Sequence, residues 1–170
     1  MGISIFEKGN IGEESLITWF HENSIPFLAI DQSLGTFAHF FAKNGKRPDF
    51  LILLHSLGLI AVDAKNCALS NGYFTLTEQE IMDALSFQLI YRIAFWFAFL
   101  HIQHNIPTWY WINSVKAAGT GMKRQNGKTG QAFRAISLGD FVPIRTRRDL
   151  GELWVDQVTW KPKIIKIDFI

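Results

Sequence analysis

Two apolar segments separated by three residues constrain the fold of this chain more than any other feature of its sequence. Residues 47–54 (RPDFLILL) and 58–65 (GLIAVDAK) are both rich in branched apolar side chains. The three residues between them suit a tight turn, because Gly58 can adopt the positive φ that such turns require. Near-continuous apolarity is typical of strands covered on both faces. The two segments therefore predict a buried β-hairpin.

The register of this hairpin brings two carboxylates, those of Asp49 and Asp63, to the same place. If Leu54 pairs with Gly58 across the turn, the two aspartates lie directly opposite each other. Opposed side chains project to one face of the sheet with their Cβ atoms about 5 Å apart. Lys65 shares that face with Asp63, since alternate residues of a strand point the same way. A shift of one residue in register would separate the two aspartates.

Carboxylates this close repel each other unless a proton or a cation lies between them. Mg²⁺ binds through one or two carboxylates and keeps several of its waters. Lys65 beside them can orient or deprotonate a water, or stabilise negative charge on a reacting phosphate, and metal-activated water is a standard route to phosphodiester cleavage. In the plainer alternative, Asp49 is a turn residue, and Asp63 and Lys65 form an ion pair at the end of a strand.

The segments around the hairpin predict an α/β layer fold. Residues 11–23 are expected to be a helix capped by Asn10, with Glu13 as its capping-box partner and an apolar stripe of Leu16, Ile17 and Phe20. The chain is expected to form a single domain, with a core at about residues 10–115 and a basic loop with accessory strands at 116–170. The other expected elements are strands at 27–30, 108–115, 133–138 and 141–144, a helix at 77–104 that opens with a capping box at Thr77–Glu80 and contains the apolar run 93–100, a glycine-rich loop at 116–131, an ambiguous segment at 150–158 and an edge strand at 160–170.

Pro48-Asp49 and Asp63-Ala64-Lys65 resemble the motif of the PD-(D/E)XK nuclease superfamily, and their separation of 14 residues is normal for its hairpin. That superfamily also has a glutamate near the start of the preceding helix. Glu13 fits this position, whereas Glu14 lies about 100° further round a helix and fits less well. The segment Gly12–Ile17 resembles the start of archaeal Holliday-junction resolvases of this superfamily.

The resemblance implies a restriction-endonuclease-like core of three layers, in which helices flank a central mixed sheet. It implies a nuclease that cuts nucleic acid, with DNA as the expected substrate and RNA as the alternative. Glu13, Asp49, Asp63 and the carbonyl of Ala64 would hold Mg²⁺ or Mn²⁺, and Lys65 would position or activate water. Two other functions stay open: a nucleic-acid-binding module of the same fold with an idle site, and a protein-interaction domain.

The distribution of charge suits a site for cations and a separate surface for a polyanion. Residues 1–115 hold 6 Lys and Arg against 10 Asp and Glu, a net charge of −4, while residues 116–170 hold 11 against 5, a net charge of +6.

Gln88 and Tyr91 form Q-x-x-Y, one residue shorter than the Q-x-x-x-Y of some superfamily branches, and Gln88 is a candidate phosphate contact. The candidate nucleic-acid-binding residues in the basic loop are Lys116, Lys123, Arg124, Lys128 and Arg134. A solvated surface loop is the alternative.

Composition limits the compartment and the partners that are expected for the protein. Cys67 is the one cysteine, so a disulfide within the chain is excluded and a reducing compartment such as the cytoplasm is expected. The N-terminus lacks the basic and apolar regions of a secretory signal, and the apolar run 93–100 is too short to span a bilayer, so no membrane association is expected. The 15 Phe and 6 Trp suit a large core, and they leave open a homodimer that buries aromatic surface.

Overall fold

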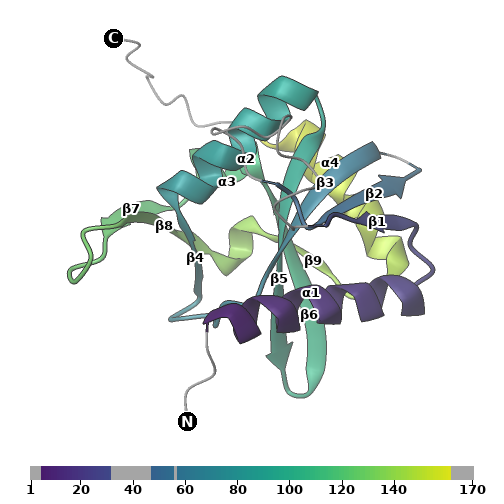
Figure 1. Cartoon of the computed structure of the whole chain (residues 1–170), viewed down its shortest axis with the longest axis horizontal. Coiled ribbons are helices and arrows are strands. Elements are labelled where there is room, and N and C mark those ends of the chain that lie inside the picture. Colours follow the sequence, from purple (N-terminus) through teal and green to yellow (C-terminus); the bar gives the residue numbers. More distant parts are fainter. Residues whose placement is uncertain (1–4, 32–46, 56, 162–170) are drawn as a thin grey trace.

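The computed structural model describes residues 5–31, 47–55 and 57–161 (Figure 1). In this part of the chain the helices are α1 (Ile5–Glu22), α2 (Glu78–Tyr91), α3 (Ser114–Gly119) and α4 (Glu152–Thr159), with 3-10 turns η1 (Leu138–Asp140) and η2 (Arg147–Gly151). The strands are β1 (Phe27–Ala29), β2 (Phe50–Leu54), β3 (Gly58–Lys65), β4 (Tyr73–Thr77), β5 (Ala94–Gln103), β6 (Ile106–Asn113), β7 (Met122–Gln125), β8 (Ala132–Ser137) and β9 (Val142–Ile144).

The described strands form a central mixed sheet in the order β1-β2-β3-β5-β6-β9 and a smaller sheet in the order β4-β8-β7. In the central sheet only β3 and β5 pair parallel, among the strands described. Side chains of α1, η2 and α4 pack on one face, while α2, α3 and the smaller sheet pack on the other. This is the predicted α/β architecture, a central mixed sheet flanked by helices. From α1 to β5 its elements follow the order helix–strand–hairpin–helix–strand, apart from β4, which belongs to the smaller sheet.

The β2–β3 hairpin has the predicted register. Leu54 lies opposite Gly58, and Phe50 lies opposite Val62. Gly58 has a φ of 74°, the positive value that the turn was expected to need. The regular pairing ends at Phe50, because the backbone N–H of Asp49 donates to the carbonyl of Val62 at 2.9 Å and Val62 already lies opposite Phe50. Asp49 is therefore not paired directly opposite Asp63, which is the pairing that the sequence predicted. The register therefore brings Asp49 to the end of β3 that carries Asp63 and Lys65.

The prediction of one long helix over 77–104 was wrong. α2 ends at Tyr91, and Arg92 caps it in the left-handed conformation with a φ of 57°. The apolar run that follows is β5, which lies in the middle of the central sheet with both faces covered. A continuous apolar run has no period that separates a buried helix from a buried strand. The aromatic side chains of residues 95–99 were the signal in favour of a strand.

Other boundaries also differ from the predicted ones. α1 begins at Ile5 rather than at residue 11, so Asn10 lies within the helix and is not its N-cap. The expected loop at 116–131 contains the end of α3 and all of β7, because β7 pairs with β8 in a hairpin. The ambiguous segment 150–158 is the end of η2 followed by α4. The predicted edge strand at 160–170 lies mostly outside the described residues.

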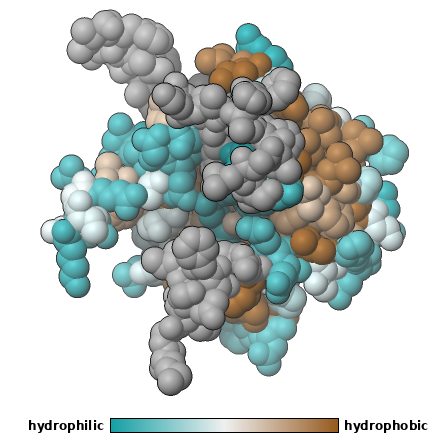
Figure 2. Space-filling model, in the orientation of Figure 1, coloured by the Kyte–Doolittle hydropathy of each residue, from teal (hydrophilic) through white to brown (hydrophobic). Residues whose placement is uncertain are grey.

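Apolar side chains are exposed at one edge of the central sheet. Leu28, Leu53 and Leu59 lie on the same face of β1, β2 and β3, as their register shows. Figure 2 shows this hydrophobic surface on the right of the molecule. The homodimer left open by the composition stays a prediction, and a mass measurement in solution would decide it. Within the described residues, no helix is long and apolar enough to cross a membrane.

Candidate active site

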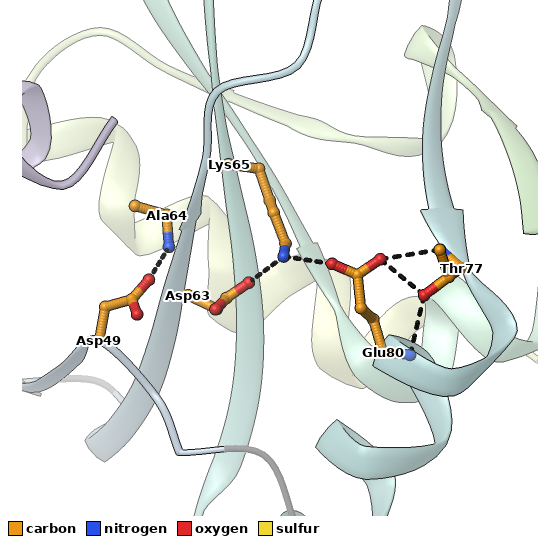
Figure 3. A network of polar contacts seen from close by, with 6 residues as sticks. All are labelled: Asp49, Asp63, Ala64, Lys65, Thr77 and Glu80. Carbon is orange, nitrogen blue, oxygen red and sulfur yellow. Dashed lines mark hydrogen bonds and ion pairs between the residues drawn. The ribbon is translucent and has the colours of Figure 1, made fainter. Parts of the chain in front are cut away.

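The end of the β2–β3 hairpin opposite its turn gathers the predicted catalytic residues of the two strands. Asp49 directly precedes β2, and one oxygen of its carboxylate accepts a hydrogen bond from the backbone N–H of Ala64 at 2.7 Å. Asp63, one residue earlier on β3, is only 2% exposed (Figure 3). Burial of a carboxylate is costly unless charged or polar groups compensate for it. The chain thus holds two carboxylates at one strand end, with Asp49 bonded to Ala64 rather than paired directly opposite Asp63.

Lys65 is the cation of this cluster. Its Nζ lies 2.9 Å from a carboxylate oxygen of Asp63 and 2.5 Å from one of Glu80, and 5.9 Å from the centre of the Phe97 ring. Burial opposes the charged form of Lys65, but the charges of Asp63 and Glu80 outweigh that cost and raise its pKa above the ordinary value. Lys65 is therefore an ammonium at neutral pH in this arrangement. An ammonium orients water and stabilises negative charge, and it cannot accept a proton.

Glu80 is a member of the cluster that the sequence did not predict. It was expected to close a capping box with Thr77, and this prediction is confirmed. Its Oε2 accepts hydrogen bonds from the backbone N–H of Thr77 at 2.9 Å and from its hydroxyl at 2.8 Å. The other oxygen, Oε1, reaches Lys65 (Figure 3). One side chain thus caps α2 and fixes the position of the lysine, and the pattern Thr-x-x-Glu reveals only the first of these roles.

Helix α1 approaches the same strand end through a glycine. A Cβ placed on Gly12 would lie 3.2 Å from the Cβ of Asn66 and 3.7 Å from the carbonyl carbon of Lys65. A side chain at this position would therefore require its neighbours to shift by a few tenths of an ångström. Glu13, the next residue, is partly buried, whereas Glu14 is exposed. Of the two glutamates, Glu13 is thus the less exposed one beside this contact.

The chemistry of these donors fits Mg²⁺ or Mn²⁺. Carboxylates of Glu13, Asp49 and Asp63 and the carbonyl of Ala64 would be the ligands, and hard divalent cations prefer such oxygens. The carboxylates of Asp49, Asp63 and Glu80 accompany the ammonium of Lys65 at this strand end, which leaves a formal charge of −2 when all are ionised. In the part of the chain that the structure describes, no three acidic, His or Cys side chains are already gathered as a metal site. Metal binding here is thus a proposal, and it requires these side chains to draw together around the ion.

Gln88, the candidate phosphate contact, is held within the fold. Its side-chain oxygen accepts hydrogen bonds from the backbone N–H of Phe95 at 3.1 Å and from the hydroxyl of Ser114 at 3.0 Å. These bonds tie the end of α2 to the start of β5 and to α3. The role of Gln88 in nucleic-acid binding stays a prediction.

The basic residues predicted to bind phosphate fall into two groups. Lys116 forms an ion pair with Asp156, and Arg134 is buried with its Nε 3.0 Å from a carboxylate oxygen of Glu78. The other three lie on exposed parts of the β7–β8 hairpin, and they are Lys123, Arg124 and Lys128. The first group has carboxylate partners within the protein, and the second is oriented toward solvent.

No protein-family model and no curated protein matches this chain. Two of the solved structures that are similar to it are a Holliday junction resolvase and a viral nuclease. The Holliday junction resolvase Hjc of the archaeal hyperthermophile Archaeoglobus fulgidus matches 85% of this chain and 96% of its own, with 11% identity and a TM-score of 0.49. D212, a nuclease from a fusselovirus, matches 95% of this chain and 99% of its own, with 10% identity and a TM-score of 0.46. Identity this low leaves the function of this chain to be argued from its own site.

Proposed function

We propose that this chain is a metal-dependent nuclease that hydrolyses phosphodiester bonds in DNA. The observation that carries the proposal is the convergence of Asp49, Asp63 and Lys65 at one end of the β2–β3 hairpin. An ion pair alone would require one acid for one lysine, whereas Lys65 contacts two carboxylates, those of Asp63 and Glu80, and that of Asp49 lies at the same strand end. A bound Mg²⁺ or Mn²⁺ would supply an activated water and neutralise phosphate charge.

The residues of the chain have separate roles in this proposal. Asp49 and Asp63 hold the metal with Glu13 and the Ala64 carbonyl. Lys65 keeps its charge beside the site and stabilises the negative charge that develops on the phosphate. Glu80 acts through Lys65 and is a positioning residue, because its carboxylate holds the ammonium toward Asp63.

Cleavage of a panel of labelled substrates tests the proposal. Duplex, branched and single-stranded DNA are incubated with the protein and Mn²⁺, and products are separated on a denaturing gel. We expect cleavage of at least one DNA substrate, abolished by chelator and by Asp63→Asn. A purified, folded protein that cuts none of them in Mn²⁺ would contradict the nuclease function and favour a binding module with an idle site.

Mn²⁺ is also expected to raise the melting temperature of the protein. The carboxylates repel one another without a metal, and a ligand that binds only the folded state stabilises it by RT ln(1 + [L]/Kd), about 2.7 kcal/mol at a hundredfold excess over Kd. Differential scanning fluorimetry in chelator and in Mn²⁺ measures the shift. Asp63→Asn is the matched control, since it keeps the shape of the side chain and should lose most of the shift. Equal shifts for the two proteins would place the metal elsewhere.

A further inference from the structure

The β7–β8 hairpin forms an arm, residues 121–132, that projects from the body of the protein (Figure 1). All twelve residues of the arm are exposed. The turn at its tip is nevertheless held by its own hydrogen bonds: the side-chain oxygen of Asn126 accepts from the backbone N–H of Lys128 at 2.9 Å, and its backbone carbonyl accepts from Gly130 at 2.8 Å. The arm is therefore a structured two-stranded ribbon that contributes little to the core.

The chain segment that forms the arm and its base has no acidic residue. From Lys116 to Gly139 the sequence has five basic residues and no acidic one. Lys116 and Arg134 at the base have carboxylate partners, as described above, whereas Lys123, Arg124 and Lys128 are in the exposed arm. The other polar side chains of the arm are those of Gln125, Asn126, Thr129 and Gln131. Figure 2 shows this hydrophilic projection on the left of the molecule.

The base of the arm is joined to the candidate active site through the first turn of α2. Arg134 of β8 pairs with Glu78, and Glu80, two residues further along, contacts Lys65. Glu78 also lines a shallow pocket with Lys123, Arg124 and Gln125 at the root of the ribbon. A polyanion bound along the arm would therefore lie next to the end of the sheet that carries the site.

We propose that the arm enters the major groove of double-stranded DNA, so that the substrate of this site is a duplex; this inference rests on the proposed nuclease function. The major groove of B-DNA, about 12 Å wide, admits a two-stranded β-ribbon and offers base edges to amide and hydroxyl side chains. The major groove of duplex RNA is too narrow for side chains to read. Proteins that bind single strands stack bases on aromatic rings, and the arm contains no aromatic residue. The basic residues of the arm contact the phosphates on either side of the groove.

An edge strand with exposed lysines has another explanation, since such charges prevent edge-to-edge pairing between proteins. The two explanations differ in what the charges do for binding. Protection of an edge predicts that neutral polar substitutions leave DNA affinity unchanged, whereas groove binding predicts a loss specific to duplex DNA.

Nucleic-acid binding is measured in the presence of a chelator, which prevents metal-dependent cleavage during the test. Fluorescence anisotropy with a 30-base-pair DNA duplex, the matching single strand and the matching RNA duplex compares two double variants with the unmodified protein. Lys123→Gln/Lys128→Gln removes two charges from the arm. The control variant, Arg147→Gln/Arg148→Gln, removes two exposed charges near the turn of the β2–β3 hairpin. This turn and the candidate active site lie at opposite ends of the hairpin.

We expect the arm variant to lose roughly tenfold or more in duplex affinity and about 2 units in the slope of log K against log salt, because each neutralised phosphate contributes about 0.9. The duplex affinity of the control variant should change less than about twofold, because its two charges lie away from the bound phosphates. The single-strand affinity of the arm variant should also change less than about twofold. Methylation of guanine N7, which blocks the major groove, should weaken the duplex complex of the unmodified protein and have little effect on that of the arm variant.

Three results would overturn the inference: equal losses for the two double variants, unchanged affinity of the arm variant, or tighter binding of single strands or duplex RNA than of duplex DNA. The nuclease function is tested separately, by Mn²⁺-dependent cleavage. Duplex binding that depends on the arm, in a protein that cuts nothing, would support the groove contact and contradict the nuclease function. Cleavage confined to single strands would do the reverse.

Discussion

Lys65→Met is expected to lower the rate of DNA cleavage by about 10²–10³-fold, the cost of removing one preorganised charge from a transition state. The Nζ of Lys65 lies 2.9 Å from Asp63, one of the two carboxylates of the hairpin end. In the proposed nuclease the ammonium would therefore be beside the place where charge develops on the phosphate. Methionine keeps an unbranched stem of similar length, so the packing of the side chain changes little. Single-turnover cleavage at saturating Mn²⁺ measures the effect.

The same substitution is expected to destabilise the protein in chelator, and this must be separated from the effect on chemistry. Without Lys65 the carboxylates of Asp63 and Glu80 lose the cation between them, at a cost of about 3 kcal/mol. Mn²⁺ supplies positive charge and should restore much of the melting temperature, but not the activity. Lys65→Arg, which keeps the charge, is the control and should retain more activity than Lys65→Met. A folded Lys65→Met protein with full activity would contradict the assignment.

The hairpin could be predicted because local chemistry determines it. Gly58 suits the turn, and the turn sets the register from Leu54–Gly58 to Phe50–Val62. That register brings Asp49 to the strand end that carries Asp63, although the two are not paired directly. The strand β5 was missed because its apolar run has no solvent-facing side to set a period, and because no glycine or proline marks the end of α2. Arg92 adopts the left-handed conformation there instead, with its backbone N–H bonded to the carbonyl of Gln88, and residues other than glycine seldom do so. The second sheet was missed for a related reason, since β4 and β8 are far apart in sequence.

The residues of the candidate site also differ in whether the sequence alone predicts their position. Asp63 and Lys65 are two residues apart on one strand, so their common face follows from the period of a strand. Glu80 joins them from a helix that follows another strand, and its capping role already accounted for its place in the sequence. Contacts between elements depend on how the helix packs, and one sequence does not fix this. The basic segment at residues 116–131 was recognised by its charge. It was expected to be a loop, because its strand β7 forms only through pairing with β8.

Glu13→Gln and Glu14→Gln are expected to differ in kind, although the two residues are neighbours. α1 begins at Ile5, so both glutamates lie well inside the helix. The expected capping box between Asn10 and Glu13 is therefore absent, and neither residue lies in the first turn, where the helix dipole acts. The two substitutions should cost the helix equally little. The partly buried Glu13 follows Gly12, which touches the end of β3, whereas the exposed Glu14 points away.

If Glu13 is a metal ligand, Glu13→Gln should lower cleavage by about 100-fold or more, because the amide keeps the shape of the side chain but removes a charge that the metal needs. Glu14→Gln should leave cleavage within about twofold, the range usual for exposed surface changes. The melting temperatures of the two variants in chelator should agree, and the shift caused by Mn²⁺ should be smaller for Glu13→Gln alone. The second readout does not depend on catalysis, so it separates a lost ligand from a misplaced substrate. Equal activities and equal Mn²⁺ shifts would mean that Glu13 does not reach Asp49 and Asp63, and that the metal is held by the hairpin without α1.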